Sequence, residues 1–254
     1  MGDAVAAEDQ ISRRHMDRRR LWGVVLAGGE GVRLRALSQR ICGDQRPKQY
    51  VPILGGSTLL RQTLDRVALE IAPARTVVVT LRSHARYWAG SDGCHVLVQP
   101  SDRGTVAGIL SPVHWIARWY PGATIAVFPC DHFVSEPALS MARITQIADW
   151  VDRHPEWLVL LGARATRPEV EYGWIEPGPP LDSAPGGLIR TVRRFWEKPS
   201  EETARMCLQD GCLWNTFIVV GKVATFLRAG REAVPVVDDR LRWARAFFGT
   251  DDEA

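Results

Sequence analysis

Residues 21–34 read LWGVVLAGGEGVRL, an apolar run that leads into a glycine-rich segment and Arg33. Runs of β-branched and aromatic residues favour a strand, which the sequence predicts over Trp22–Leu26. Glycines permit positive φ angles and let backbone N–H groups approach an anion without a Cβ in the way. The segment Gly28–Arg33 is therefore a candidate phosphate-binding loop, although a tight strand–helix turn would show the same pattern.

The loop matches neither of two common nucleotide-binding signatures. It is not the GxGxxG of a dinucleotide-binding fold, and it is not a P-loop because no Lys-Ser/Thr pair follows Gly31. Its context is more specific, since Arg46-Pro47-Lys48-Gln49 places a lysine on a turn that proline fixes. Alone, Lys48 would be interpreted as a surface charge. Beside the loop it is a candidate second phosphate ligand.

Up to about residue 163, short apolar runs that predict strands alternate with segments whose apolar residues recur at helical spacing. Further strands are expected at Thr76–Leu81, His95–Val98, Thr124–Pro129 and Trp157–Gly162. Helices are expected at Thr58–Ile71, Thr105–Tyr120 and Pro137–Arg153. This alternation favours an α/β fold with a mostly parallel sheet flanked by helices.

Glycine, proline and charged residues interrupt this pattern after residue 163. Short strands are expected at Gly173–Glu176, Leu188–Glu197 and Leu213–Val220, with a surface loop at Glu176–Gly187. The mixture predicts antiparallel additions to the sheet and a loop-rich lid over its carboxyl edge. Two helices, at about 222–233 and 239–248, are expected to follow.

The composition is ordinary for a globular protein, with 46% hydrophobic residues and a net charge of +3. No apolar run approaches the ~20 residues that span a bilayer, so we expect a cytoplasmic protein without a membrane partner. The five cysteines include no CxxC pair, which predicts buried thiols rather than a disulfide framework or a zinc site. The arginines at 13–20 favour a disordered basic tail over residues 1–20 rather than a nucleic-acid-binding segment.

Five further elements follow the loop and the PKQ turn in order along the chain. They are QPSDRGT at 99–105, FPCDH at 128–132, EYGWIE at 171–176, FWEKP at 195–199 and LWNT at 213–216. Together these residues resemble the sugar-1-phosphate nucleotidyltransferases, particularly the mannose-1-phosphate guanylyltransferases. The resemblance extends from Leu21 to about Val220. It implies a three-layer α/β/α Rossmann-like nucleotide-diphospho-sugar transferase fold with a mixed, mostly parallel central sheet.

The resemblance also assigns roles to residues at its motifs. It implies that Arg33, Lys48 and Asp131 are catalytic, and that Asp131 binds Mg²⁺ because its hard oxygen suits this cation. For His132 a positioning or structural role is favoured over that of a general base. The nucleotide-binding residues would be Leu26, Ala27, Gly28, Gly29, Gly31, Arg33, Gln99, Gly104 and Thr105. The sugar-phosphate contacts would be Gly173, Glu197, Lys198 and Asn215, each of which could alternatively make only local hydrogen bonds.

The chain departs from the family pattern at several positions. Val32 stands where a threonine or serine is usual, and Thr216-Phe217 stands where Ser-Gly is frequent. The family also supplies a second metal-binding aspartate, often in a W-x-D-x-G segment, and nothing after Val220 matches it. Residues 21–254 are therefore expected to form one nucleotidyltransferase catalytic domain that is truncated at its C-terminus.

The implied activity is transfer of a nucleotidyl group from a nucleoside triphosphate, GTP, to mannose 1-phosphate. Two alternatives stay open: a uridylyl- or thymidylyltransferase acting on glucose 1-phosphate, and a catalytically weak nucleotide-sugar-binding or regulatory homologue. The expected partners are thus the triphosphate and the sugar 1-phosphate, and a homo-oligomer is left open.

Overall fold

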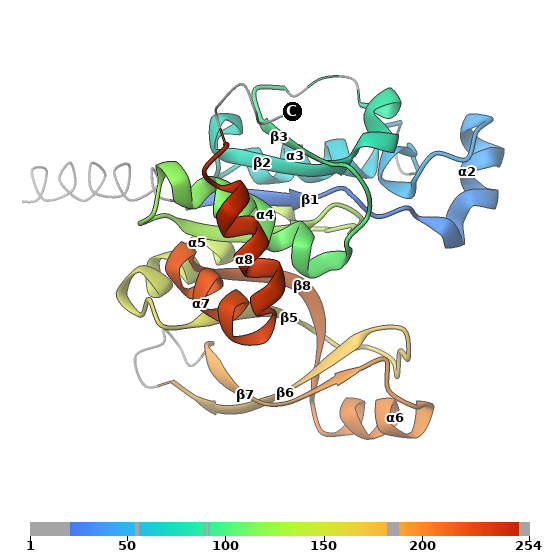
Figure 1. Ribbon diagram of the computed structural model, residues 1–254. Coiled ribbons are helices and arrows are strands. Elements are labelled where there is room, and N and C mark those ends of the chain that lie inside the picture. Colours follow the sequence, from blue (N-terminus) through green and yellow to red (C-terminus); the bar gives the residue numbers. More distant parts are fainter. Residues whose placement is uncertain (1–20, 54–55, 89, 91, 182–187, 249–254) are drawn as a thin grey trace, which may run out of the picture. The chain divides into compact units, whose positions relative to one another are not determined.

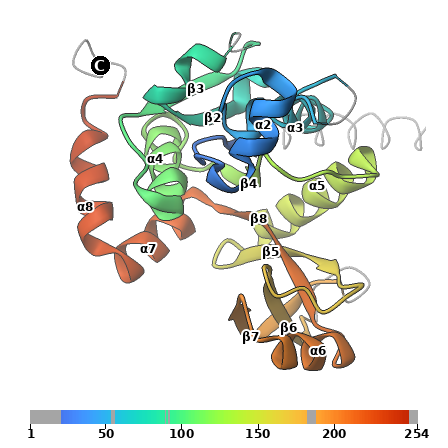
Figure 2. The same cartoon turned by 90° about the vertical axis from the view of Figure 1, so that its right-hand side faces the viewer.

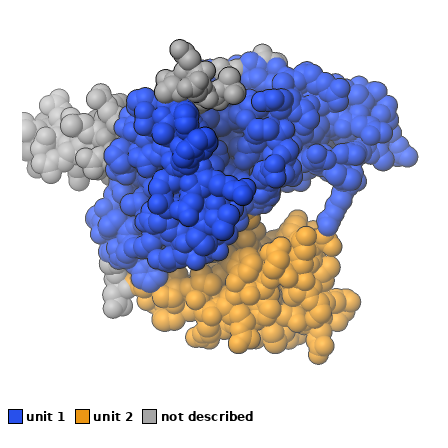
Figure 3. Space-filling view, viewed as in Figure 1, with its two compact units in different colours: residues 1–158, 220–254 blue, residues 159–219 orange. Residues whose placement is uncertain are grey.

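The computed structural model describes residues 21–53, 56–88, 90, 92–181 and 188–248 (Figure 1). They divide into two compact units, coloured separately in Figure 3: unit 1 comprises the residues up to 158 and from 220 onwards, and unit 2 comprises residues 159–219. The predicted tail at 1–20 and part of the loop predicted at 176–187 lie outside the described residues. Strands β5 (Leu158–Arg164) and β8 (Leu213–Lys222) each extend across a boundary between the units.

The centre of unit 1 is a parallel sheet in the order β3-β2-β1-β4. Its strands are β1 (Leu21–Leu26), β2 (Thr76–Leu81), β3 (His95–Gln99) and β4 (Thr124–Pro129). Leu26 is in register with Val79 of β2 and with Pro129 of β4. The carboxyl ends of neighbouring strands therefore meet at one edge, as the sequence predicts for an α/β sheet.

Unit 1 has its core in and around three of these strands, β1, β2 and β4, which are buried along almost their whole length. Val24, Val78 and Val127, one from each strand, are completely buried. Parallel strands that are covered on both faces are continuous apolar runs rather than alternating ones, and LWGVVL, TVVVTL and TIAVFP have this character.

Helices cover both faces of this sheet and give unit 1 three layers (Figure 2). On one face lie α3 (Leu59–Ala68) and α5 (Pro137–Arg153). On the other lies α4 (Gly104–Trp119), with α7 (Val223–Ala233) and α8 (Pro235–Ala244) packed against it. The remaining helical segments described in this unit are η2 (Val32–Leu34), α2 (Arg35–Cys42), η3 (Lys48–Tyr50), η4 (Pro73–Arg75) and η5 (Arg82–Tyr87).

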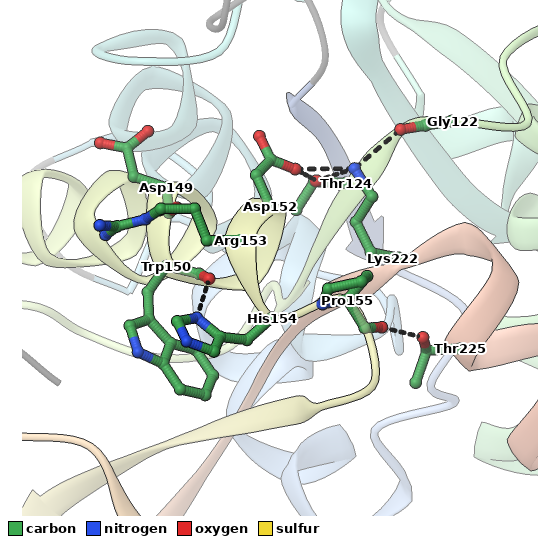
Figure 4. A network of polar contacts seen from close by, with 10 residues as sticks. All are labelled: Gly122, Thr124, Asp149, Trp150, Asp152, Arg153, His154, Pro155, Lys222 and Thr225. Atoms are coloured by element: carbon green, nitrogen blue, oxygen red, sulfur yellow. Dashed lines mark hydrogen bonds and ion pairs between the residues drawn. The ribbon is translucent and has the colours of Figure 1, made fainter. Parts of the chain in front are cut away.

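The last residue of β8, Lys222, takes part in a polar network within unit 1, at the end of the sheet opposite the carboxyl edge (Figure 4). Lys222 Nζ donates to the Gly122 carbonyl at 2.8 Å, to Thr124 Oγ1 at 3.0 Å and to Asp152 Oδ1 at 2.7 Å. The lysine side chain is 15% exposed and that of Asp152 23%. The network thus joins the end of β8 to the start of β4 and the end of α5.

Unit 2 is built on antiparallel pairing, as the sequence predicts after residue 163. Strand β6 (Gly173–Pro180) pairs with β7 (Arg190–Glu197) and with β8, and β5 also pairs with β8. Helix α6 (Glu201–Gln209) completes the described elements, with Ser200 Oγ capping it by accepting a bond from Thr203 N. A small core forms where the completely buried Trp174 packs with buried residues of α6 and the turn after it.

One predicted boundary in unit 2 is wrong. Strand β6 continues through Pro177–Pro180, which the sequence assigned to a surface loop. Its register with β7 shifts between Glu176 and Pro177 and again before Pro180. Proline lacks an N–H for a regular ladder, and these irregularities let the strand accommodate it.

The thiol prediction is partly confirmed. All five cysteines are free, and Cys130, Cys207 and Cys212 are buried, whereas Cys42 and Cys94 are only half-buried.

Candidate active site

The glycine loop follows β1 and closes against the backbone of the PKQ turn. Gly31 has φ 61°, and a Cβ at this position would lie 2.9 Å from the backbone nitrogen of Lys48 and 3.4 Å from Pro47 Cα. Position 31 therefore requires glycine both for its backbone angle and for the space beside it. Gly29, by contrast, faces open space, with nothing within 4 Å of a Cβ placed there.

The Gln49 side chain holds the glycine loop by hydrogen bonds, a role that the sequence did not predict. Its side chain is 1% exposed, and its Nε2 donates to the carbonyls of Ala27 and Gly29, each at 2.8 Å. A buried amide with both donor hydrogens used is a satisfied polar group that holds its partners in place. The only signal in the sequence is its position directly after Lys48 in the PKQ motif.

Lys48 and Asp131 are brought together although they lie 83 residues apart in the chain. Lys48 Nζ donates to Asp131 Oδ2, and the two side chains are 33% and 27% exposed. Asp131 stands just beyond the end of β4, whose last residue, Pro129, is in register with Leu26 at the end of β1. The predicted catalytic lysine and aspartate therefore meet at the carboxyl edge of the sheet, where open α/β sheets bind ligands.

His132 lies beside this pair, with its Nε2 3.9 Å from Asp131 Oδ1. Burial lowers the pKa of His132, and the attraction of Asp131, which acts in the opposite direction, does not overcome it. The imidazole is therefore neutral near pH 7, which agrees with a positioning role and does not make it an additional cation for phosphate.

The other predicted nucleotide-binding residues lie around the same loop. Ala27 is buried and its N–H donates to Val79 O at 2.8 Å, which ties the start of the loop to β2. A Cβ at Gly28 would lie 3.8 Å from Gln99 Oε1, so the glutamine amide approaches the loop. Arg33 is exposed in η2, directly after the glycines.

Gly104 and Thr105 form the first turn of α4. Gly104 has φ 79°, and its N–H donates to Asp102 Oδ1 at 2.8 Å. Both residues are exposed, so their backbone and the threonine hydroxyl are accessible to a ligand.

The predicted sugar-phosphate residues gather in unit 2. Gly173 and Glu197 are register partners in β6 and β7. A Cβ at Gly173 would lie 3.2 Å from Glu197 Oε2, 3.3 Å from Asn215 Cβ and 2.9 Å from Phe195 Cζ. Glycine at position 173 therefore lets the Phe195 ring, the Glu197 carboxylate and Asn215 pack closely against the backbone of β6.

Local hydrogen bonds and backbone angles limit which donors and acceptors of the predicted sugar-phosphate residues remain available to a ligand. Asn215 Oδ1 accepts a bond from Phe217 N at 3.0 Å, and its NH₂ group remains a potential donor to a ligand. Phe217 and Lys198 both have positive φ angles, 61° and 45°, which are uncommon for residues other than glycine. Such backbone strain collects at binding sites, and here it flanks Glu197 and Asn215.

Two further features are absent from the described residues. No group of three or more His, Cys, Asp or Glu side chains in this part of the chain could hold a metal ion. None of the helices described is long and apolar enough to cross a membrane.

Comparison with known proteins assigns the family. The model of the family described as Nucleotidyl transferase matches residues 22–239. The chain is 29% identical over 229 residues to the xanthan biosynthesis protein XanB of Xanthomonas campestris pv. campestris, a match that covers 87% of this chain and 46% of XanB. It is 28% identical over 223 residues to a mannose-1-phosphate guanylyltransferase of Sinorhizobium fredii, covering 84% of this chain and 41% of that protein.

A crystal structure with the same fold comes from Thermus thermophilus and is named mannose-1-phosphate geranyltransferase. It matches with a TM-score of 0.78 and 30% identity, over 89% of this chain and 64% of that chain. This chain spans about half the length of the curated relatives it matches. The predicted α/β fold with parallel core strands is confirmed by this likeness, and the chain belongs to the nucleotidyl transferase family.

Proposed function

We propose that this chain transfers a nucleotidyl group from a nucleoside triphosphate to a sugar 1-phosphate and releases pyrophosphate. The observation that carries the proposal is the meeting of Lys48 and Asp131 at the sheet edge where the glycine loop begins. A cation, a carboxylate and a loop of accessible backbone are what a reaction between two phosphate groups requires. Membership of the nucleotidyl transferase family supports the same reaction.

The reaction needs no covalent protein nucleophile. An oxygen of the sugar 1-phosphate attacks the α-phosphorus, and pyrophosphate leaves in line, so that the protein mainly positions the groups and neutralises their charge. Lys48 would contact the α-phosphate and the incoming sugar phosphate. Arg33, exposed beside the loop, would contact the triphosphate and the charge that develops on the leaving pyrophosphate.

Asp131 fits a role as a magnesium ligand with few protein partners. Its Oδ2 accepts from Lys48, while the described part of the chain offers no cluster of three acidic, histidine or cysteine side chains. Mg²⁺ commonly takes one or two carboxylates and completes its shell with substrate phosphates and water. When bound, it would supply neutralisation of the crowded phosphate charge. Asp131 would hold it, and Lys48 would contact the phosphates.

The sugar would be recognised by complementary hydrogen-bonding groups of unit 2. Glu197 offers a carboxylate that accepts bonds from hydroxyls, and Asn215 offers amide hydrogens that donate to a hydroxyl oxygen. Gly173 lets both residues lie close to the backbone of β6.

For the substrate pair we propose GTP and mannose 1-phosphate. Support comes from the Sinorhizobium fredii relative, whose name is mannose-1-phosphate guanylyltransferase. The Gln99 amide near Gly28 can donate and accept at a base edge, which is compatible with guanine but does not select it.

The test is pyrophosphate release from each of the four nucleoside triphosphates, combined with mannose 1-phosphate or glucose 1-phosphate in the presence of Mg²⁺. We expect the largest kcat/KM for GTP with mannose 1-phosphate. Preference for UTP or dTTP with glucose 1-phosphate would overturn the proposed substrate pair but would still support the nucleotidyl-transfer reaction. Release with no pair, from protein that is folded by circular dichroism, would overturn the transferase proposal in favour of a binding or regulatory homologue.

A further inference from the structure

Two arginines of unit 1, Arg35 and Arg86, have no role in the candidate active site around Lys48 and Asp131. A surface cavity of about 440 Å³ is lined by Arg35, Asp44, Gln45, Arg86 and Tyr87. These residues come from the start of α2, the turn before the PKQ motif and η5. The volume is within the range of small-molecule sites.

One of the charges lining the cavity is already neutralised. Both carboxylate oxygens of Asp44 accept bonds from Arg46, at 2.8 Å from Nε and 2.9 Å from Nη2. These bonds outweigh desolvation and hold the pKa of Asp44 below its usual value, so the carboxylate is ionised and paired. The Asp44–Arg46 pair therefore adds no net charge to the cavity.

Arg86 forms none of the ion pairs found among the described residues, although its charge helps to lower the pKa of Asp44 in the same cavity. Its guanidinium carbon lies 4.8 Å from the centre of the Tyr87 ring, and that of Arg46 lies 5.4 Å from the same ring. A guanidinium oriented by an aromatic ring keeps the N–H groups at its edge available to an oxyanion.

Arg35 is held only loosely. Its Nη2 donates to Glu30 Oε2 at 3.1 Å, and the two side chains are 43% and 50% exposed. Exposed ion pairs of this kind contribute little to stability, so Arg35 can exchange the carboxylate for a phosphate group without a large penalty. The cavity thus presents two arginines to a ligand. The carboxylates beside them are Glu30, which pairs with Arg35, and Asp44, which pairs with Arg46.

We propose that this cavity binds a phosphorylated small molecule through Arg35 and Arg86, as an anion site separate from the Lys48–Asp131 pair. The forked donors of arginine match the oxygens of a phosphate group. The volume leaves space for more than the phosphate, and Gln45 and Tyr87 provide an amide and a ring to contact the remainder. A nucleoside phosphate and a sugar phosphate share this chemistry, and the experiment below distinguishes them.

The test is isothermal titration calorimetry of the full chain with GTP and, separately, with mannose 1-phosphate. Both are titrated into Lys48→Ala, in which the first site is impaired, and into Lys48→Ala/Arg86→Ala. We expect Lys48→Ala to retain one binding event and the double variant to bind at least about 10-fold more weakly, the effect of losing a charge-assisted hydrogen bond. The ligand retained by Lys48→Ala identifies the source of the phosphate.

Two further variants serve as controls. Arg82→Ala, introduced into the Lys48→Ala background, removes an exposed arginine of the same 3₁₀ helix that does not line the cavity, and it should leave the affinity unchanged. Arg86→Lys in that background keeps the charge but loses the fork, and it should bind with intermediate affinity even if Arg86→Ala is poorly folded. Loss of both ligands in Lys48→Ala alone, or equal affinity with and without Arg86, would overturn the proposal. The readout is binding, so its failure is separable from failure of pyrophosphate release.

Discussion

The contact between Lys48 and Asp131 joins the two charged groups on which turnover is expected to depend. Replacing Lys48 with Met or Asp131 with Asn removes one preorganised electrostatic contact from the site and should reduce kcat by roughly 100-fold. Because the two side chains touch each other, the double variant should be only slightly slower than the slower single variant. Steady-state pyrophosphate release measures all three.

A matched control exists for these two substitutions. Arg61 forms exposed ion pairs with Asp65 at 2.8 Å and Asp92 at 2.6 Å in the same unit, and it belongs to none of the motifs assigned to the site. Arg61→Ala should change kcat by less than about two-fold, since exposed pairs contribute little. Wild-type rates in both Lys48→Met and Asp131→Asn would place the catalytic site elsewhere.

Gly31 provides a test of the loop itself. Alanine at this position would combine an unfavourable φ of 61° with a Cβ 2.9 Å from Lys48 N, and the free energy of unfolding should fall by about 1–3 kcal/mol. Gly29→Ala is the matched variant, because its Cβ would meet nothing within 4 Å, and it should stay within about 0.5 kcal/mol of wild type. Urea unfolding compares the two, and equal losses would show that the contact with Lys48 is not what demands glycine.

At the same scale, the motifs located most of the candidate residues but not the bonds between them. The sequence places Lys48 and Asp131 in separate motifs, and only the paired strands β1 and β4 bring the two side chains together. Gln49 shows the limit more sharply. A glutamine in a loop is ordinarily exposed. The burial of Gln49 and its hydrogen bond to the Ala27 carbonyl arise from tertiary packing, which no local sequence pattern encodes.

Among the elements, the position of the last residue of β8 relative to β4 and α5 depends on Lys222. Replacing it with Met would leave Asp152 and the Gly122 carbonyl without their lysine donor in a largely buried place. The free energy of unfolding should fall by about 1–3 kcal/mol. In a double-mutant cycle with Asp152→Asn, we expect a coupling energy of about 1 kcal/mol, measured by urea unfolding. Additive losses would mean that the two side chains act independently.

The elements that the sequence predicted best are those with the strongest apolar pattern. The central strands β1, β2 and β4 lie where the sequence has continuous apolar runs, because a strand buried on both faces needs apolar residues at consecutive positions. Strand β6 was cut short in the prediction, since Pro177–Pro180 has the composition of a loop and only pairing with β7 makes it a strand. The cavity at Arg86 was also not foreseen, because it unites three segments whose side chains show no common pattern.

For the whole molecule, buried histidines should make stability depend on pH. The pKa values of His84 and His114, which are almost completely buried, are lowered by burial. A histidine whose pKa is lower in the folded protein binds fewer protons there than in the unfolded chain. Its contribution is therefore complete above the unfolded pKa of about 6.5 and declines as the pH falls below it. The decline is at most about 1.4 kcal/mol per pH unit for each proton of difference.

His114 is the histidine with which to test this dependence. Its Nε2 lies 2.9 Å from Asp238 Oδ1, and both residues are almost completely buried. Burial tends to raise the pKa of Asp238, but hydrogen bonds from Arg242 and His114 outweigh it and keep the carboxylate ionised. Because Arg242 already balances that charge, the imidazole can remain neutral and donate one N–H to Asp238.

His114→Gln keeps an amide donor for Asp238 and removes the titrating ring. Between about pH 6.5 and 5 its free energy of unfolding should fall less steeply than that of wild type, while above about pH 7 the two curves should run parallel. The remaining slope belongs to His84 and the carboxylates. Urea unfolding at half-unit steps of pH supplies the curves, and an NMR titration of His114 should give a pKa below about 6.5. A higher pKa would contradict the prediction, because the pair with Asp238 would then be a charged ion pair whose contribution to stability is lost as the pH rises.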